Sequence, residues 1–393
     1  MSEQDLLSES QKDVYRELQQ HLDTLPIGYP ATKSGVEIKL LKQVFTPEEA
    51  EIASKLNFSA GDLESIDAIH ERLKSIGLKY TKDELEAHLD NMAKKGGILM
   101  LKEGTQKTYG NALFIVGIFE FQVNKLTKEF AKDAEQYLRE GFLMDMAKIP
   151  IGQLRTIPIG VTIDHDVKIA NFDQIMNLIA EMDTPIALVN CVCRQEKEKL
   201  GKTCTTTSRM ETCMAFGKFA QTYIDFGWAR EISREEAIEV LKKNEEEGLV
   251  FQPGNSQKAD FICSCCNDCC LGLSIIKRMP NPADLVQTNF FAEIDIDLCA
   301  GCGTCIERCP MDAITLEDDV SSISRPRCIG CGNCIYVCPE GAIKLVKKDK
   351  ETIPARTPSD LYDNILTMRT KLLEMERKRK ARLEKKKTQS KNN

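Results

Sequence analysis

The sequence predicts a chain of several α+β domains, and three observations support this class. Residues 36–135 combine three well-capped helix starts with two strand-like runs. Residues 136–285 alternate strand and helix signals and hold nine cysteines, so we expect a cysteine-rich α/β module there. Residues 286–350 repeat one cysteine motif at an offset of 29 residues. An arm over 1–35 and a basic helical tail over 351–393 complete the expected organisation, and 393 residues suffice for two to four domains.

Composition and charge limit the function classes. No stretch reaches the roughly 18 apolar residues of a membrane helix, and the polar N-terminus lacks the apolar core of a signal peptide. We therefore expect a cytoplasmic protein. From Met368 onward the chain has 11 basic and 3 acidic residues, so a net charge of −7 leaves −15 on the rest. An acidic body is not the profile of a nucleic-acid-binding core.

The pattern of the first 135 residues predicts several helices followed by a β-hairpin. The arm reads as one helix broken around "LPIGYPATKSG". Helix starts follow at Thr46, where a proline and a glutamate complete the signal, at Ser65, and at Thr81, which has a glutamate three residues later. The third helix stops at Gly96, and two strand-like runs follow, "ILMLKEG" and "TYGNALFIV". We interpret residues 36–135 as a winged-helix-like module.

A winged helix commonly binds DNA, but the charge here argues against it. Residues 45–111 hold 9 basic and 12 acidic residues, and the would-be recognition helix "KDELEAHLDNMAKK" is acidic toward its start. Phosphate contacts require Lys and Arg, which supply most of the non-specific affinity. We therefore expect a docking module for protein, and no nucleic-acid partner.

The middle of the chain alternates element signals. "RTIPIGVTI", "DVKI" and the continuous apolar run "PIALVNCVC" predict strands, whereas "FDQIMNLIAEM" predicts a helix. Another helix should start at Ser233 and end near Gly248. His165 lies in "DHD", but alternate residues of a strand share a face, so the two flanking aspartates would point away from it. We do not expect a metal site at His165.

The strongest chemical signal is the cysteine repeat. "CAGCGTCIERCP" begins at Cys299 and "CIGCGNCIYVCP" at Cys328, and both follow C-x2-C-x2-C-x3-C-P. All 17 cysteines lie between Cys191 and Cys338. Cytosolic thiols are kept reduced, so dense cysteines there indicate metal or redox chemistry. Zinc favours two separated C-x2-C pairs, whereas this run holds [4Fe-4S] clusters.

Residues 286–350 thus resemble a bacterial-type ferredoxin with two [4Fe-4S] clusters. In such ferredoxins the fourth cysteine of each motif ligates the other cluster. The resemblance therefore implies two ligand sets. One set is Cys299, Cys302, Cys305 and Cys338, and the other is Cys328, Cys331, Cys334 and Cys309.

The other nine cysteines form two groups along the chain. Cys191 and Cys193 should end a buried strand and point to one face, with Cys204 in a loop and Cys213 at the start of a helix. The second group is the run "CSCCNDCC" at 263–270, in which neighbours such as Cys265 and Cys266 point to different sides. We expect at least one further iron–sulfur cluster, or alternatively a structural zinc. The candidate ligands are Cys191, Cys193, Cys204, Cys213, Cys265, Cys266, Cys269 and Cys270.

The layout as a whole resembles a group of anaerobe proteins. They join a module like this N-terminal one, a "CVCR" strand, a CC-x2-CC knot and a C-terminal dicluster ferredoxin. The central part is also similar to the cysteine-rich modules of heterodisulfide reductases, which hold a catalytic cluster, but here the double cysteine and the C-x2-C merge into one stretch. Their activity therefore does not carry over.

Taken together, the sequence predicts an iron–sulfur electron-transfer protein. Single electrons would pass through the two C-terminal clusters to or from a central cysteine-bound cluster and a partner oxidoreductase. One alternative is a reductase whose central cluster reduces a small substrate, and another is a redox-responsive transcription factor. No carboxylate pair, Ser/His/Asp set or phosphate loop stands out, so no catalytic residue is assigned.

Overall fold

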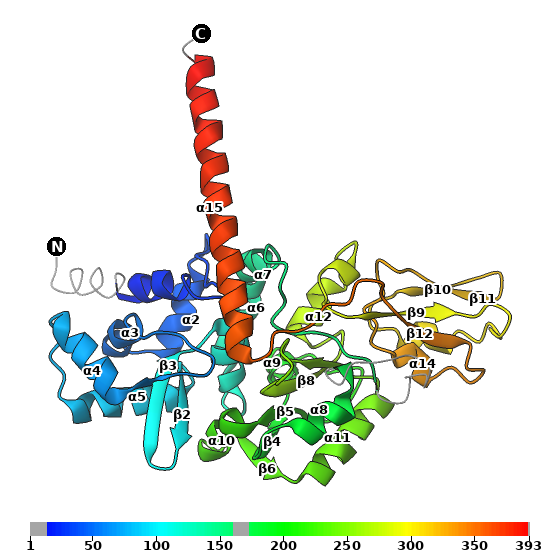
Figure 1. Ribbon diagram of the computed structural model, residues 1–393, viewed down its shortest axis with the longest axis horizontal. Coiled ribbons are helices and arrows are strands. Elements are labelled where there is room, and N and C mark those ends of the chain that lie inside the picture. The colour runs from blue at the N-terminus through cyan, green and yellow to red at the C-terminus, as the bar shows by residue number, and fades with distance from the viewer. Residues whose placement is uncertain (1–13, 160–172, 392–393) are drawn as a thin grey trace.

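The computed structural model describes residues 14–159 and 173–391 (Figure 1). The expected strand "DVKI", the end of "RTIPIGVTI" and His165 lie outside the described residues.

The N-terminal region is helical with a small sheet. Residues 14–22 are helical. The helices that follow are α2 (Val36–Val44), α3 (Pro47–Ala53), α4 (Ile66–Ser75) and α5 (Lys82–Lys95). Capping boxes at Thr46 and Thr81 start α3 and α5, and Ser65 caps α4, which confirms the three helix starts. An antiparallel sheet in the order β1-β3-β2 comprises β1 (Glu64–Ser65), β2 (Ile98–Glu103) and β3 (Gln106–Asn111).

Irregular and helical segments then lead to the middle of the chain. They are η1 (Phe114–Ile118), η2 (Glu120–Gln122), α6 (Lys128–Tyr137), η3 (Leu138–Phe142) and α7 (Leu143–Met146). Tyr15 and Leu18 of the arm lie in the same apolar core as these segments and as Ile365 near the C-terminus. The arm is therefore part of the N-terminal core.

A five-stranded sheet forms the centre, in the order β6-β4-β5-β8-β7, with every neighbouring pair antiparallel. Its strands are β4 (Ile186–Asn190), β5 (Glu211–Phe216), β6 (Ala229–Ile232), β7 (Val250–Pro253) and β8 (Phe261–Cys265). The helices of this region are α8 (Ile175–Glu181), α9 (Val192–Lys199), α10 (Gly217–Asp225), α11 (Arg234–Glu246) and α12 (Leu271–Ile276).

Alternation along the strands explains why both faces of this sheet are covered. Ile186 and Leu188 of β4 pack in one core with residues of α8 and α11. Ala187 and Val189 point to the other face and join the core of the N-terminal region and α10. A strand that is buried on both faces reads as a continuous apolar run, as "PIALVN" does.

The C-terminal region is built from two similar halves. Its elements are η6 (Pro282–Asp284), β9 (Phe290–Ile294), α13 (Thr304–Arg308), β10 (Ile314–Glu317), β11 (Val320–Ile323), α14 (Asn333–Tyr336) and β12 (Ile343–Lys347). β9 pairs with β12, and β10 pairs with β11, all antiparallel.

The long helix α15 (Pro358–Lys391) returns to the N-terminal region and then projects beyond the body of the molecule (Figure 1). Arg369 anchors it, because its guanidinium lies 2.9 Å from a carboxylate oxygen of Asp23 and 3.4 Å from one of Asp145. Within the ranges that the structure describes, no helix is both long enough and apolar enough to cross a membrane.

Candidate metal centres

The eight cysteines of the repeat lie around two separate cavities. Cys299, Cys302, Cys305 and Cys338 line one of them. The other is lined by Cys309, Cys328, Cys331 and Cys334. The fourth cysteine of each motif therefore lies with the first three of the other motif, in the arrangement that the resemblance implies. We call these sets the exposed quartet and the buried quartet.

The backbone around both quartets is suited to an anionic group held by thiolates. Gly301 and Gly330 have φ angles of +66° and +65°, and a Cβ at either would lie 2.3 Å from a backbone oxygen, so each turn requires glycine. Backbone N–H groups also face the sulfurs, for example Ala313 N to Cys309 Sγ at 3.3 Å and Ala292 N to Cys328 Sγ at 3.4 Å. Such donors favour the thiolate form. The donor set therefore fits iron–sulfur clusters.

Comparison with known proteins agrees with this geometry. A family model described as the 4Fe-4S dicluster domain matches residues 292–339. The chain carries a C-terminal dicluster ferredoxin domain. The chain is also similar to a probable ferredoxin of Methanosarcina thermophila, with 54% identity over 28 residues. That match covers 7% of this chain and 48% of the relative, or about half of the relative's length. No solved structure matches the chain.

The two quartets of the ferredoxin domain differ in burial. Cys302 is exposed, and a hydrogen bond from the Thr304 hydroxyl lowers the pKa of its thiol. A backbone hydrogen bond from Ser321 likewise lowers the pKa of Cys299. In the buried quartet, burial raises the pKa of Cys331 and of Cys334. The exposed quartet is thus the one that faces solvent.

Six further thiols form a closed ring in the central module. Each of them interacts with two others, in the order Cys191, Cys193, Cys270, Cys265, Cys263, Cys213 and back to Cys191. Interactions with neighbouring thiols lower the pKa of Cys263 and Cys270 and raise that of Cys193 and Cys265. One cubane uses four thiolates, so this ring exceeds the needs of a single cubane. We call it the six-thiol ring.

Three local expectations for these cysteines need correction. β4 ends at Asn190, so Cys191 precedes α9 and Cys193 lies in the first turn of that helix, not on a strand. Cys213 lies within β5, opposite Val189 of β4, and does not start a helix. The sequence reasoning also omitted Cys263 from the candidate ligands. Its spacing of two from Cys265 could have revealed it, because alternate residues of a strand share a face.

The remaining central cysteines lie in a second, more compact group. The ligand atoms of Cys204, Cys266, Asp268 and Cys269 all lie within 4.8 Å of one another. The Sγ atoms of Cys204 and Cys266 are 3.6 Å apart. Cys265 and Cys266 are therefore adjacent in sequence but belong to different groups. We call this set the compact site.

Arg194 lies between the two central groups and is fully buried. Its guanidinium donates to the Thr212 hydroxyl at 2.6 Å and to the Ser264 carbonyl at 3.1 Å. Burial alone would lower its pKa, but charges from Cys191, Cys213, Cys266 and Cys204 outweigh burial and raise it. A cation in this place stabilises thiolates on both sides. Lys202, in the loop after α9, is largely exposed and pairs with Glu135.

An apolar core connects the six-thiol ring with the ferredoxin domain. Cys265 and Cys270 of the ring share this core with Cys331 of the buried quartet, and Met311 and Ile329 fill the space around them. A neighbouring core holds Cys305 of the exposed quartet and Cys334 of the buried quartet. Packed side chains therefore connect the three thiol sets in the order exposed quartet, buried quartet and six-thiol ring.

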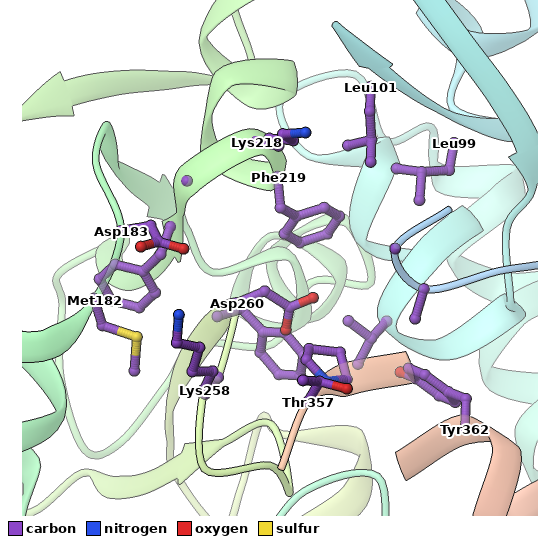
Figure 2. A pocket seen from close by; sticks show the side chains of 18 of the residues that line it. Leu99, Leu101, Met182, Asp183, Lys218, Phe219, Lys258, Asp260, Thr357 and Tyr362 are labelled. Atoms are coloured by element: carbon purple, nitrogen blue, oxygen red, sulfur yellow. The ribbon is translucent and has the colours of Figure 1, made fainter. Parts of the chain in front are cut away.

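A separate cavity of about 280 Å³ lies where the N-terminal region, the central sheet and α15 meet. Figure 2 shows Asp260 in its middle, with Leu99 and Leu101 of β2 on one side and Tyr362 of α15 on another. Burial raises the pKa of Asp260 to about 6. The residues that line this cavity include no cysteine. The cavity is therefore separate from the six-thiol ring.

Proposed function

We propose that the protein transfers single electrons between a partner oxidoreductase and a centre held by the six-thiol ring. The two quartets of the ferredoxin domain would hold [4Fe-4S] clusters, and the ring would hold at least one further iron–sulfur cluster. Bound clusters supply one-electron redox chemistry. The contribution of the chain is to arrange the sites in order and to shield all but one of them from water.

The observation that carries this proposal is the continuous order of the thiol sets. Cys302 is exposed, Cys305 and Cys334 share one core, and Cys331, Cys265 and Cys270 share the next. The order runs from solvent to the centre of the molecule. Such an arrangement supports entry of electrons at the exposed quartet and storage or use at the ring.

The surface around the exposed quartet supports docking of a redox partner there. Ile296 and Leu298, just before Cys299, are 67% and 54% exposed. Apolar side chains beside a redox site are suited to a transient protein interface, since the centre of such an interface is depleted of charge. We therefore place the partner's contact on this face.

Freeze-quench electron paramagnetic resonance (EPR) after mixing with a reduced bacterial ferredoxin as donor would test the order. In the wild type, the ferredoxin-domain signals should appear before that of the ring. Ile296→Glu should slow every signal without loss of iron, while Ile353→Glu, at an equally exposed residue outside the cluster motifs, should have little effect. Reduction of the ring at the wild-type rate in Cys331→Ser, which breaks the middle site, would contradict the proposal.

The cavity in Figure 2 favours one second candidate, a reductase that acts on a small organic substrate. Phe216 and Phe261 line it. Cys213 lies three residues before Phe216 on β5, and Cys263 lies two residues after Phe261 on β8. A mostly apolar space with a few charged groups is typical of ligand sites. The charged groups here are Glu181, Asp183, Asp260 and two lysines.

The reductase candidate is tested with dithionite-reduced protein and no partner. Turnover of a small substrate by the wild type, and its loss in Ala259→Trp, which fills the cavity, would support it. If every substrate tried oxidises the wild type and Ala259→Trp at equal rates, the reductase candidate is wrong and electron transfer remains the proposed function.

A further inference from the structure

We propose that Cys204, Cys266, Cys269 and Asp268 bind a single tetrahedral metal ion, zinc, separate from the iron–sulfur centres. The residues come from two places in the chain. Cys204 lies in the loop after α9, and the other three lie in the turn between β8 and α12. Cys266 and Cys269 are almost completely buried, whereas Cys204 and Asp268 are partly exposed.

The spacing of the ligand atoms matches one ion. Zinc binds thiolates at about 2.3 Å in a tetrahedron, which places two sulfurs about 3.8 Å apart. The Sγ atoms of Cys204 and Cys266 lie 3.6 Å apart, and Cys204 Sγ lies 3.7 Å from Asp268 Oδ1. Three thiolates and one carboxylate complete four-coordination, as in closed structural sites.

Asp268 is held in the orientation that a ligand needs. Its Oδ2 accepts hydrogen bonds from the Thr205 backbone N–H at 2.6 Å and from the Thr205 hydroxyl at 2.8 Å. Oδ1 is thereby left facing the thiols. Partners that fix a ligand from outside in this way are typical of metal sites. The adjacent Arg194 offsets negative charge on Cys204 and Cys266.

The ferredoxin quartets provide an internal contrast. Across the described ranges, only the compact site brings three or more Cys, His or acidic ligand atoms within 4.8 Å of one another. The quartets do not, although the family match assigns them to clusters. Thiolates on different irons of a cubane radiate from it and stay farther apart than ligands of one ion. The spacing at the compact site therefore indicates an ion and not a cubane.

An ion here would fix the geometry of the neighbouring centres. It would join the loop after α9 to the turn that connects Cys265, at the end of β8, with Cys270, at the start of α12, and both of these belong to the six-thiol ring. In the same turn, Asn267 donates to the Pro310 carbonyl of the ferredoxin domain at 3.0 Å. The zinc would thus be structural, and it would hold the turn on which both the ring and the domain contact depend.

Metal analysis of full-length protein, purified anaerobically, tests this assignment. The wild type should contain about one zinc per chain in addition to its iron. Cys204→Ser should contain no zinc, and Asp268→Ala should bind zinc more weakly. The EPR signals of the ferredoxin domain should persist in both variants. The matched control is Cys302→Ser, which should lose iron from the exposed quartet and keep the zinc.

X-ray absorption at the zinc edge of the wild type keeps the test decisive even if a variant fails to fold. A shell of three sulfurs and one oxygen or nitrogen is expected, with Zn–S distances of about 2.3 Å. Absence of zinc from the wild type, or a shell of four sulfurs, would overturn the assignment. Loss of iron from Cys204→Ser with zinc unchanged would overturn it too and would make the compact site part of a cluster.

Discussion

Gly330→Ala should remove the buried quartet's cluster, and the structure allows the effect to be estimated. Gly330 has a φ angle of +65°, and an alanine Cβ would lie 2.3 Å from the Phe290 carbonyl oxygen and 2.9 Å from the Thr288 hydroxyl. The left-handed conformation costs alanine about 1–2 kcal/mol. Separating the Cβ from the Phe290 oxygen to a tolerable 3.0 Å requires the backbone next to Cys331 to shift by about 0.7 Å. Ligand geometry tolerates only about 0.5 Å.

Gly341→Ala is the matched control, because Gly341 has a nearly equal φ angle of +62° and no atom within 4 Å of the place that an alanine Cβ would occupy. It carries the conformational cost without the clash. Iron quantitation and EPR after anaerobic purification should show about four irons fewer in Gly330→Ala, as one cubane is lost, and full iron in Gly341→Ala. Equal iron and equal spectra in the two variants would refute the reasoning that the turn must approach β9 closely.

Three further predictions concern the acid in the cavity, the anchor of α15 and the N-terminal module. Burial raises the folded-state pKa of Asp260 from 3.8 to about 6, so wild-type stability is lost as the pH rises between these values. Asp260→Asn should thus be more stable than the wild type above pH 6, by up to about 3 kcal/mol, but not at pH 4; a difference in thermal midpoint that is independent of pH would contradict this. Arg369→Met should cost about 2 kcal/mol in denaturant unfolding, because the carbonyls of Asp23 and Leu25 and the Asp23 carboxylate lose a charged donor, whereas exposed Lys371→Met should stay within about 0.5 kcal/mol. A chain without residues 371–393 should not bind duplex DNA, because α5 is acidic toward its start and phosphate contacts require Lys and Arg. Binding that weakens steeply with salt would show that the acidic α5 does not prevent phosphate contacts.

The helix starts and the C-terminal chemistry could be predicted from the sequence alone. Capping residues such as Thr46 and Thr81 signal helix starts because a side chain satisfies orphan backbone donors within three residues. The two C-x2-C-x2-C-x3-C-P motifs likewise predict iron–sulfur clusters from the short spacing of their cysteines. The family match to residues 292–339 supports this prediction. Both kinds of pattern involve residues close together in the chain, so they can be recognised without knowledge of the tertiary structure.

The division of the nine central cysteines could be learned only from the folded chain. The six-thiol ring combines Cys193 of α9, Cys213 of β5 and Cys263 of β8, and no periodicity in the sequence records that these elements meet. Cys265 and Cys266 are neighbours in the chain, yet they belong to different sites because β8 ends between them and adjacent residues point apart. Pairing of the strands and packing of α9 against the turn select the partners of each thiol, and these contacts are long-range.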